Sequence, residues 1–204
     1  MIIKVCGLKE KENMQAIDHL QPHLLGIIFY EKSPRFFNGI EMISTKASKV
    51  GVFVNESVEK IIETAEKWDL SYIQLHGNER VEIAALLRDK GFKVIKALSI
   101  GTGINKEILK KFSPYCTYFL FDSKGKNPGG NGVKFNWEFL KEYDLETPFL
   151  LSGGIQPGDI NSIKKFEHPS FAGVDINSGF EISPGIKNVE SVKKFIDEVR
   201  TRQA

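Results

Sequence analysis

The chain has 204 residues, of which 41% are hydrophobic and 26% are charged, a globular composition that excludes a disordered or collagen-like chain. The length favours one compact domain over two, and we expect a single domain over residues 1–204. Lysine and arginine number 28 and aspartate and glutamate 26, so the net charge of +2 provides no overall field that would attract nucleic acid.

Eight short, β-rich apolar runs recur along the chain at a mean spacing of about 24 residues, the length of a short βαβ repeat. Most of these runs are continuously apolar rather than alternating, which is typical of parallel strands that are covered on both faces. The predicted strands are Ile2–Cys6, Leu24–Phe29, Lys49–Val54, Ser71–Leu75, Lys93–Leu98, Thr117–Phe121, Pro148–Leu151 and Phe171–Ile176.

The segments between the runs have the 3.6-residue period of amphipathic helices. Ser57–Trp68 has the clearest apolar stripe, and Glu79–Lys90 has a second one, with Asn78 as a predicted N-cap and Gly91 as the stop. A final helix, predicted to follow an Asn188 cap, has a stripe made of Val192, Phe195, Ile196 and Val199. The weakest predicted helix lies between Ile40 and Ser48, where the stripe is sparse.

Eight alternating units favour an α/β fold, a single (β/α)₈ barrel with parallel strands in a minimal-length version, since ~200 residues is the lower limit for that architecture. An open doubly wound sheet has the same periodicity and stays an alternative. In a barrel, the loops that follow the strands build the active face, so functional residues are expected just after each run.

Cys6 ends the first run and is followed by Gly7, which permits a tight turn. It is either a functional thiol at the mouth of the barrel or a small buried hydrophobe. Cys116 precedes the sixth run and is expected at the opposite end, so we expect no disulfide between the two cysteines. With no charged-then-apolar leader and no apolar run near the ~20 residues of a membrane span, we expect a reduced, cytoplasmic protein that contacts no membrane.

Asp122 follows the sixth run and opens a glycine-rich loop that contains Pro128, Gly129, Gly130, Asn131 and Gly132. Such loops on an active face are usually lids or ligand contacts. Asp122 is therefore a candidate catalytic acid or base, and the alternative is a simple turn former.

Small residues follow the last two strands: Gly153 and Gly154 after the seventh, and Ser178 and Gly179 after the eighth. In these barrels the corresponding loops frequently bind phosphate through backbone N–H groups, whereas the alternative is a pair of ordinary tight turns. No G-x-x-x-x-G-K-[ST] motif is present, so a nucleoside triphosphate loop is not expected.

Two further side chains are candidates for substrate binding. Arg35 stands between Pro34 and two phenylalanines, where its guanidinium suits a carboxylate, although a solvated surface arginine fits the stretch equally well. His76 ends the fourth run and either orients a ligand or hydrogen-bonds within the barrel mouth. No His/Cys/carboxylate spacing resembles a metal site, so we expect no metal and no cofactor.

Several stretches together resemble phosphoribosylanthranilate isomerase. They are KVCGL, GIIFYEKSPR, VGVFVN, IQLHGNE, FDSKGKNPGGNG, LSGGIQPGDI and GVDINSGFEISPGIKN, which span nearly the whole chain in the order of that family. The resemblance implies a (β/α)₈ barrel of tryptophan biosynthesis that catalyses the Amadori rearrangement of N-(5-phosphoribosyl)anthranilate, a small phosphosugar. It leaves open whether the chain is a monomer or a homodimer.

The resemblance also implies residue roles. Cys6 matches the general base of the family and Asp122 the general acid, and Arg35 matches the arginine expected to meet the anthranilate carboxylate. His76 and Asp175 match positions that line the ligand, and Gly153, Gly154, Ser178 and Gly179 match the phosphate-binding turns. Two positions depart from the family pattern, Asn131 where threonine is more frequent and Asn188 where aspartate is usual.

The base must lose a proton, so we expect positive charge or the substrate itself to lower the pKa of Cys6 below ~8.5. Lys4 is two residues away on the same side of the strand and is not expected to supply this charge. Three rival readings remain: a phosphosugar isomerase of histidine biosynthesis, which would carry a carboxylate in place of Cys6; a metal-dependent sugar-phosphate epimerase; and a catalytically silent phosphate-binding barrel.

Overall fold

The structure is a computed structural model that describes residues 1–101, 103–123 and 136–201. Eight parallel strands close into a barrel in chain order, because β1 pairs with β8 as well as with β2. The strands are β1 Ile2–Cys6, β2 Leu24–Ile28, β3 Ser48–Phe53, β4 Tyr72–Leu75, β5 Lys93–Ile100, β6 Tyr118–Ser123, β7 Phe149–Leu151 and β8 Phe171–Ile176. The predicted barrel is confirmed, and the closure excludes the open sheet.

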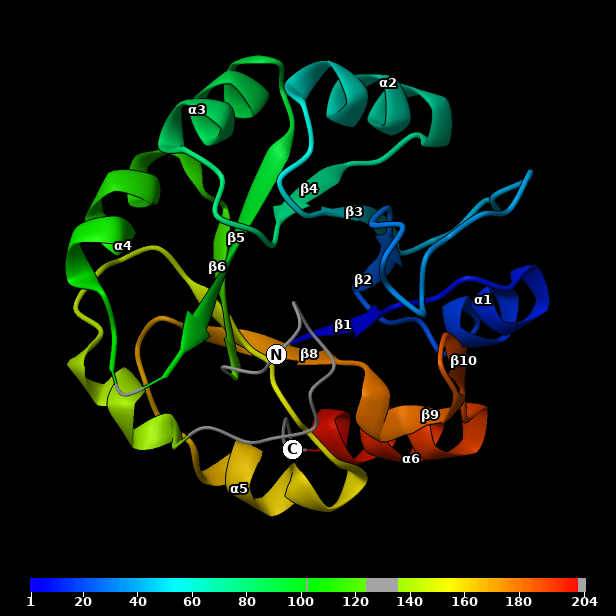
Figure 1. Ribbon diagram of the computed structural model, residues 1–204. Helices are drawn as coiled ribbons and strands as arrows, with labels where there is room; N and C mark the ends of the chain where they lie inside the picture. Colours follow the sequence, from blue (N-terminus) through cyan, green and yellow to red (C-terminus); the bar gives the residue numbers. More distant parts are fainter. Residues whose placement is uncertain (102, 124–135, 202–204) are drawn as a thin grey trace.

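Helices surround the barrel, as Figure 1 shows in a view along its axis. They are α1 Lys11–Asp18, α2 Val58–Trp68, α3 Val81–Asp89, α4 Lys106–Phe112, α5 Ile160–Lys165 and α6 Val189–Arg200, with 3₁₀ turns η1 Ser113–Tyr115, η2 Trp137–Glu142, η3 Pro157–Asp159 and η4 Ser178–Phe180. After η4 comes a small antiparallel hairpin, β9 Glu181–Ser183 and β10 Ile186–Lys187, which the sequence reading did not predict. No described helix is long and apolar enough to traverse a bilayer.

Side-chain caps fix the ends of the two strongest helices. The Ser57 side chain accepts a hydrogen bond from the backbone of Lys60 at the start of α2, and Asn188 does the same for Ser191 in α6. Gly91 has a φ of +89° after α3, which confirms it as the stop. Asn78 does not cap α3: that helix begins later, after Arg80, and the Asn78 backbone N–H donates instead to the Asn55 side chain.

The helix expected between Ile40 and Ser48 is wrong, because this segment carries no helix. Ile40 is almost fully exposed, whereas Ile43 and Ala47 are buried, so the sparse stripe has no common face to bury. The Asp18 carboxylate accepts hydrogen bonds from the backbone N–H groups of Lys46 and Ala47 and so holds the segment in an irregular path.

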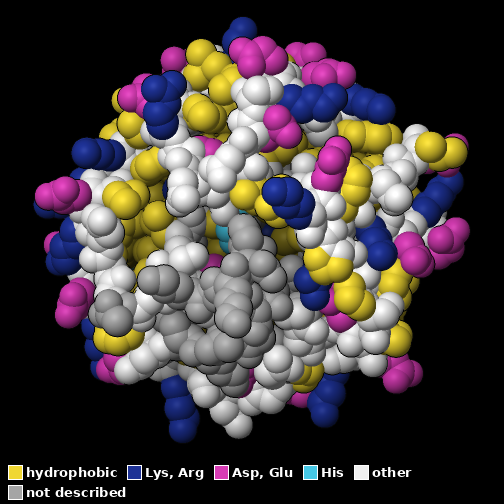
Figure 2. Space-filling view, viewed as in Figure 1, with side chains coloured by type: hydrophobic (Ala, Val, Ile, Leu, Met, Phe, Trp, Pro, Cys, Tyr) yellow, Lys and Arg dark blue, Asp and Glu magenta, His cyan; other side chains and the backbone are white. Residues whose placement is uncertain are grey.

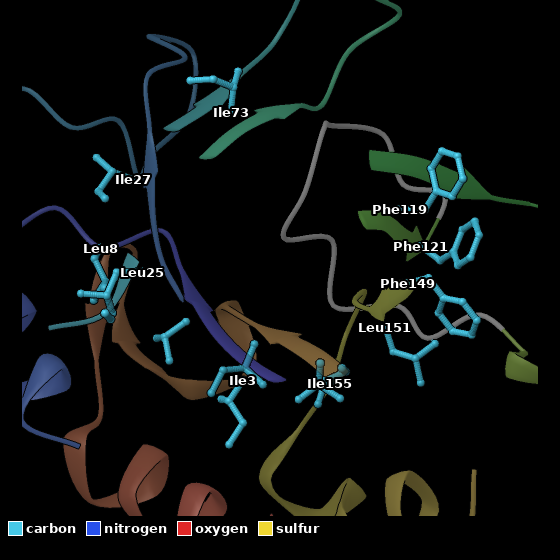
Figure 3. Close-up of a cluster of buried hydrophobic side chains, with 14 of the residues drawn as sticks. Ile3, Leu8, Leu25, Ile27, Ile73, Phe119, Phe121, Phe149, Leu151 and Ile155 are labelled. Atoms are coloured by element: carbon cyan, nitrogen blue, oxygen red, sulfur yellow. The ribbon is translucent and has the colours of Figure 1, made fainter. Parts of the chain in front are cut away.

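The core has two parts. Outside the strands, apolar side chains fill the space beneath the helices, and Figure 3 shows Phe119, Phe121 and Phe149 side by side in this layer. The Phe121 and Phe149 ring centroids lie 5.2 Å apart, a distance typical of attractive aromatic pairs. Inside the barrel, a separate layer consists of Leu24, Val50, Tyr72, Ile95, Ala97, Leu120 and Leu150.

This inner apolar layer determines what faces the active end. Side chains alternate along a strand, so residues two and four positions after a layer member point into the barrel closer to its carboxyl end. Asp122 follows Leu120 in this way, and Ser152 follows Leu150. Gln74 and His76 follow Tyr72. The same strands therefore supply both the apolar layer inside the barrel and, closer to their carboxyl ends, the polar side chains of the cavity.

Candidate active site

A cavity of about 290 Å³ lies at the carboxyl ends of the strands, near the lower end of the ~300–1,000 Å³ usual for small-molecule sites. All nine residues singled out from the sequence line it: Cys6, Arg35, His76, Asp122, Gly153, Gly154, Asp175, Ser178 and Gly179. Figure 2 shows the face viewed in Figure 1, with a histidine side chain visible in the hollow near its centre and charges of both signs around the rim.

Cys6 is buried at the end of β1 and packs over the backbone of Gly26 on β2. A Cβ atom at Gly26 would lie 2.7 Å from the Cys6 Sγ, so the absence of a side chain there makes room for the thiol. Burial raises the pKa of the Cys6 thiol, although Lys4 opposes this effect. The expected lowering of this pKa by positive charge of the protein is therefore wrong, because loss of hydration outweighs the nearby ammonium. Lowering by the substrate itself stays a prediction.

The expectation that Lys4 supplies no positive charge to Cys6 is also wrong, because Lys4 lowers the pKa of the thiol. Its side chain is fully buried, and its Nζ lies 2.9 Å from the Oδ1 of Asp175 on β8. Burial alone would lower the pKa of Lys4, but the Asp175 carboxylate and the Cys6 thiol outweigh it, so the pKa is raised and Lys4 stays protonated. The Ser152 hydroxyl donates to the second oxygen of Asp175 across 3.3 Å.

Asp122 lies within β6 rather than after it, and its carboxylate is held on both sides. The Oδ1 atom accepts a 2.8 Å hydrogen bond from the backbone N–H of Ser123, and Oδ2 lies 3.3 Å from the His76 Nε2. The Gln74 side-chain amide lies 2.8 Å from the His76 Nδ1. With the amide N–H donating to Nδ1, the ring carries its hydrogen on Nε2, facing Asp122.

Glycines with left-handed backbone follow β7. Gly153 and Gly154 have φ values of +79° and +69°, which residues with a side chain rarely adopt. A Cβ at Gly153 would lie 2.4 Å from the Ser123 backbone nitrogen and 2.8 Å from the Asp122 Oδ1, and one at Gly179 would lie 2.2 Å from the Ile155 carbonyl oxygen. The two turns are thus packed tightly against each other and against Asp122.

Arg35 comes from the loop after β2 and pairs with Glu181 at the start of β9. The Arg35 Nε lies 2.9 and 3.0 Å from the two Glu181 oxygens, and Nη2 lies 2.7 Å from Oε2. The fully buried Lys187 of β10 donates to the same carboxylate at 2.6 Å and to the Asn177 Oδ1 at 2.7 Å. Arg35 and Asn177 line the cavity, and Glu181 and Lys187 contact these two residues without lining it themselves.

Sequence reasoning missed Glu181, Lys187 and Asn177, and it undervalued Lys4. The Pro-Gly turn in the stretch from Glu181 to Lys187 was a usable hairpin signal, but strands of two or three residues are too short for periodicity to detect. Lys4 also carried a signal, because a lysine inside an otherwise apolar strand is rarely buried without a partner.

Within residues 1–101, 103–123 and 136–201, no three or more His, Cys, Asp or Glu side chains form a group suited to a metal ion. The glycine-rich loop predicted to be a lid or a ligand contact, with Asn131, lies outside the described residues. The other departure, Asn188, caps α6.

Comparison with known families matches residues 3–198 to the family described as N-(5'phosphoribosyl)anthranilate (PRA) isomerase. The N-(5'-phosphoribosyl)anthranilate isomerase of Parabacteroides distasonis is 44% identical over 98% of this chain and 93% of its own length.

Two solved structures, each 27% identical with a TM-score of 0.79, share the fold over 98% of this chain. One, matched over all of its length, is a phosphoribosyl anthranilate isomerase in complex with reduced 1-(o-carboxyphenylamino)-1-deoxyribulose 5-phosphate. The other, matched over 99% of its length, is described as monomers of the dimeric enzyme from Thermotoga maritima.

Proposed function

This chain belongs to the N-(5'-phosphoribosyl)anthranilate isomerase family, and on that premise we propose how its own residues carry out the isomerisation. The reaction is the Amadori rearrangement of N-(5-phosphoribosyl)anthranilate to 1-(2-carboxyphenylamino)-1-deoxyribulose 5-phosphate in tryptophan biosynthesis. The observation that carries the assignment is that one cavity is lined both by a thiol, Cys6 from β1, and by a carboxyl group, Asp122 from β6.

In the first step, Asp122 acts as the general acid. It donates a proton to the ribose ring oxygen, the C1′–O bond breaks, and the nitrogen lone pair forms a protonated Schiff base at C1′. The His76 ring and the Ser123 N–H each contact one oxygen of Asp122, so the carboxyl group is oriented before substrate arrives. A correctly placed acid or base contributes ~10²–10⁴-fold to the rate.

In the second step, Cys6 acts as the general base. Its thiolate removes the proton from C2′, and the electron pair forms the C1′–C2′ double bond of an enolamine, which tautomerises to the ketose. The raised pKa of the thiol, caused by burial, makes the thiolate scarce but strongly basic. Lys4 offsets part of the desolvation penalty and so supports proton removal.

Substrate binding uses the rest of the lining. Arg35 is proposed to meet the anthranilate carboxylate, and His76 and Asp175 to line the ligand beside the reacting carbons. Backbone N–H groups of Gly153, Gly154, Ser178 and Gly179 are proposed to bind the phosphate, because left-handed glycines let the chain approach an anion closely.

We further propose that residues 1–204 form one domain that works in the cytoplasm with a phosphosugar substrate and without a cofactor. The proposal covers both a monomer and a homodimer, and one of the solved relatives is described as dimeric.

The test is a fluorescence assay of purified full-length protein with N-(5-phosphoribosyl)anthranilate. The anthranilate fluorescence should decay at a rate proportional to enzyme concentration. A double variant, Cys6→Ala with Asp122→Asn, serves as the matched control and should show no decay above the buffer rate. Equal decay in the wild type and the double variant would overturn the assignment of these two residues, and no decay in either would overturn the proposed activity.

A further inference from the structure

Glu181 is bound so fully that its orientation is fixed before any substrate arrives. Its Oε1 accepts from the Arg35 Nε, the Lys187 Nζ and the Gly185 backbone N–H at 3.1 Å, and its Oε2 accepts from Arg35. Its side chain is only 5% exposed. An exposed ion pair usually has fewer donors than this, so we regard the Glu181 carboxylate as a fixed part of the structure around Arg35.

Arg35 is constrained both at its aliphatic stem and at one edge of its guanidinium. A Cβ at Gly7 would lie 2.7 Å from the Arg35 Cδ, so the aliphatic stem of the arginine passes directly over the Gly7 backbone. At the other end, Glu181 occupies Nε and one side of Nη2. Among the described residues, Nη1 forms no hydrogen bond, and Arg35 borders the cavity.

Lys187 is the second basic residue that contacts Glu181, and its backbone fixes it to α1. Its Nζ donates to both Glu181 and Asn177. Its backbone N–H donates to the side chain of Asn13, near the start of α1, and its carbonyl accepts from the same side chain. Burial lowers the pKa of Lys187, although the Glu181 carboxylate opposes this effect. Burial alone would raise the pKa of Glu181, but Arg35 and Lys187 outweigh it, so this carboxylate stays ionised at neutral pH.

We propose that Glu181 is a positioning residue that determines specificity: it holds Arg35 so that the unoccupied side of the guanidinium faces the cavity, which selects an aryl group bearing a carboxylate. This inference rests on the proposed function, in which Arg35 meets the anthranilate carboxylate. An arginine already held in its binding geometry loses little conformational freedom when the anion arrives, and its own positive charge favours that anion.

The experiment compares two substrates that differ only in this carboxylate, N-(5-phosphoribosyl)anthranilate and N-(5-phosphoribosyl)aniline. Steady-state kinetics are measured on the full chain for wild type, Glu181→Gln, Arg35→Met and the double variant. Glu181→Gln should raise KM for the anthranilate substrate roughly 10- to 100-fold and change kcat little, because misplacement of a positioned group costs this much. The same variant should leave the KM for the aniline substrate unchanged.

The double variant provides a second readout. If Glu181 acts through Arg35, adding Glu181→Gln to Arg35→Met should cause no further loss with the anthranilate substrate. Glu41→Gln removes an exposed carboxylate paired with Lys11 and is the matched control, which should behave as wild type. If the glutamine variant does not fold, Glu181→Asp is compared in the same way. The shorter side chain keeps the negative charge but moves the carboxylate away from Arg35, so KM should again rise for the anthranilate substrate only.

Equal losses with both substrates would overturn the proposal and leave Glu181 a purely structural residue. A lower KM in Glu181→Gln would also overturn it, because Glu181 would then compete with the substrate for Arg35. These outcomes are distinct from failure of the proposed function, in which the wild-type chain itself would not turn over the anthranilate substrate.

Discussion

The His76 Nε2 lies 3.3 Å from the Asp122 Oδ2, a contact that joins the end of β4 to the end of β6 past the intervening β5. Gln74 fixes the other nitrogen of the ring from two residues earlier on the same strand. The proposed acid is thus oriented by a neighbour that is itself oriented, as is usual where a proton must be delivered to one atom.

Asp122→Asn should lower kcat by ~10²–10⁴-fold, because the amide keeps the shape of the side chain but cannot donate the acid proton. The assay is the fluorescence decay, with circular dichroism to confirm the fold. Asp144→Asn, which alters an exposed carboxylate paired with Lys106, should leave kcat unchanged. Near-wild-type turnover in Asp122→Asn would remove this residue from the mechanism.

Cys6→Ala should lower kcat by a similar ~10²–10⁴-fold factor through loss of the base. Cys116→Ala is the matched control, since Cys116 lies before β6, away from the cavity lining, and should keep full activity. If both cysteine variants retained turnover, proton removal from C2′ would have to be assigned to another group.

Lys4→Met should shift the pH dependence of kcat/KM. The Cys6 pKa is raised by burial and is partly lowered again by Lys4, so removing the ammonium raises it further. The limb on which activity rises with pH should therefore move to higher pH. Rates of Cys6 alkylation by iodoacetamide should shift in the same direction. Lys193→Met, at an exposed lysine of α6, should shift neither profile; an unshifted Lys4→Met profile would show that Lys4 does not act on the thiol.

Gly153→Ala should lower kcat as well as Tm. Gly153 and Gly91 both have positive φ, so alanine brings similar backbone strain at each. A Cβ at Gly153 would also press on Ser123 and Asp122, whereas one at Gly91 meets nothing within 4 Å. Gly91→Ala should therefore lower Tm without lowering kcat, and Gly153→Ala should lower both. Equal kcat values in the two variants would contradict the contact between Gly153 and the acid.

Glu79→Gln tests the buried ion pair behind β4, in which Glu79 Oε2 lies 2.9 Å from the Lys96 Nζ. Burial alone would raise the pKa of Glu79, but Lys96 and the Asn55 N–H outweigh it, and the folded-state pKa lies below the ordinary 4.5. The stability that Glu79 contributes is therefore complete above that pH and is lost as the pH falls through the folded-state pKa.

At neutral pH, the variant should be destabilised by about 3–5 kcal/mol, the cost of leaving one buried charge unpaired. Urea unfolding at pH 7 and at about pH 3 should show the difference between wild type and variant narrowing at the lower pH. Exposed Glu63, paired with Lys60, provides the control variant Glu63→Gln, for which little change is expected at either pH. A constant difference across the two pH values would exclude the ionised pair as its source.

The repeat and the strand ends were predictable from the sequence, because each rests on local patterns. β1 and β8 have the predicted bounds, and all nine predicted site residues border one cavity, since strands of a barrel deliver their carboxyl ends to the same face. The roles of these residues stay predictions.

What the sequence did not reveal depends on contacts between distant segments. The coil around Ile43 follows its path because Asp18, from α1, binds its backbone. The protonated state of Lys4 depends on Asp175, which no local pattern links to it. The cost of burying Cys6 likewise depends on how the whole barrel excludes water from it.

The contacts that arrange the site join the two ends of the chain: Lys4 with Asp175 between β1 and β8, and Arg35 with Glu181 from the hairpin that follows. These partners are separated by 171 and 146 residues, so each contact closes a very long loop. During synthesis, the first seven strands emerge before either carboxylate exists. The last contact that the site needs is therefore made last, and a chain that stops short of β9 contains Cys6 and Asp122 but lacks the carboxylate that holds Arg35.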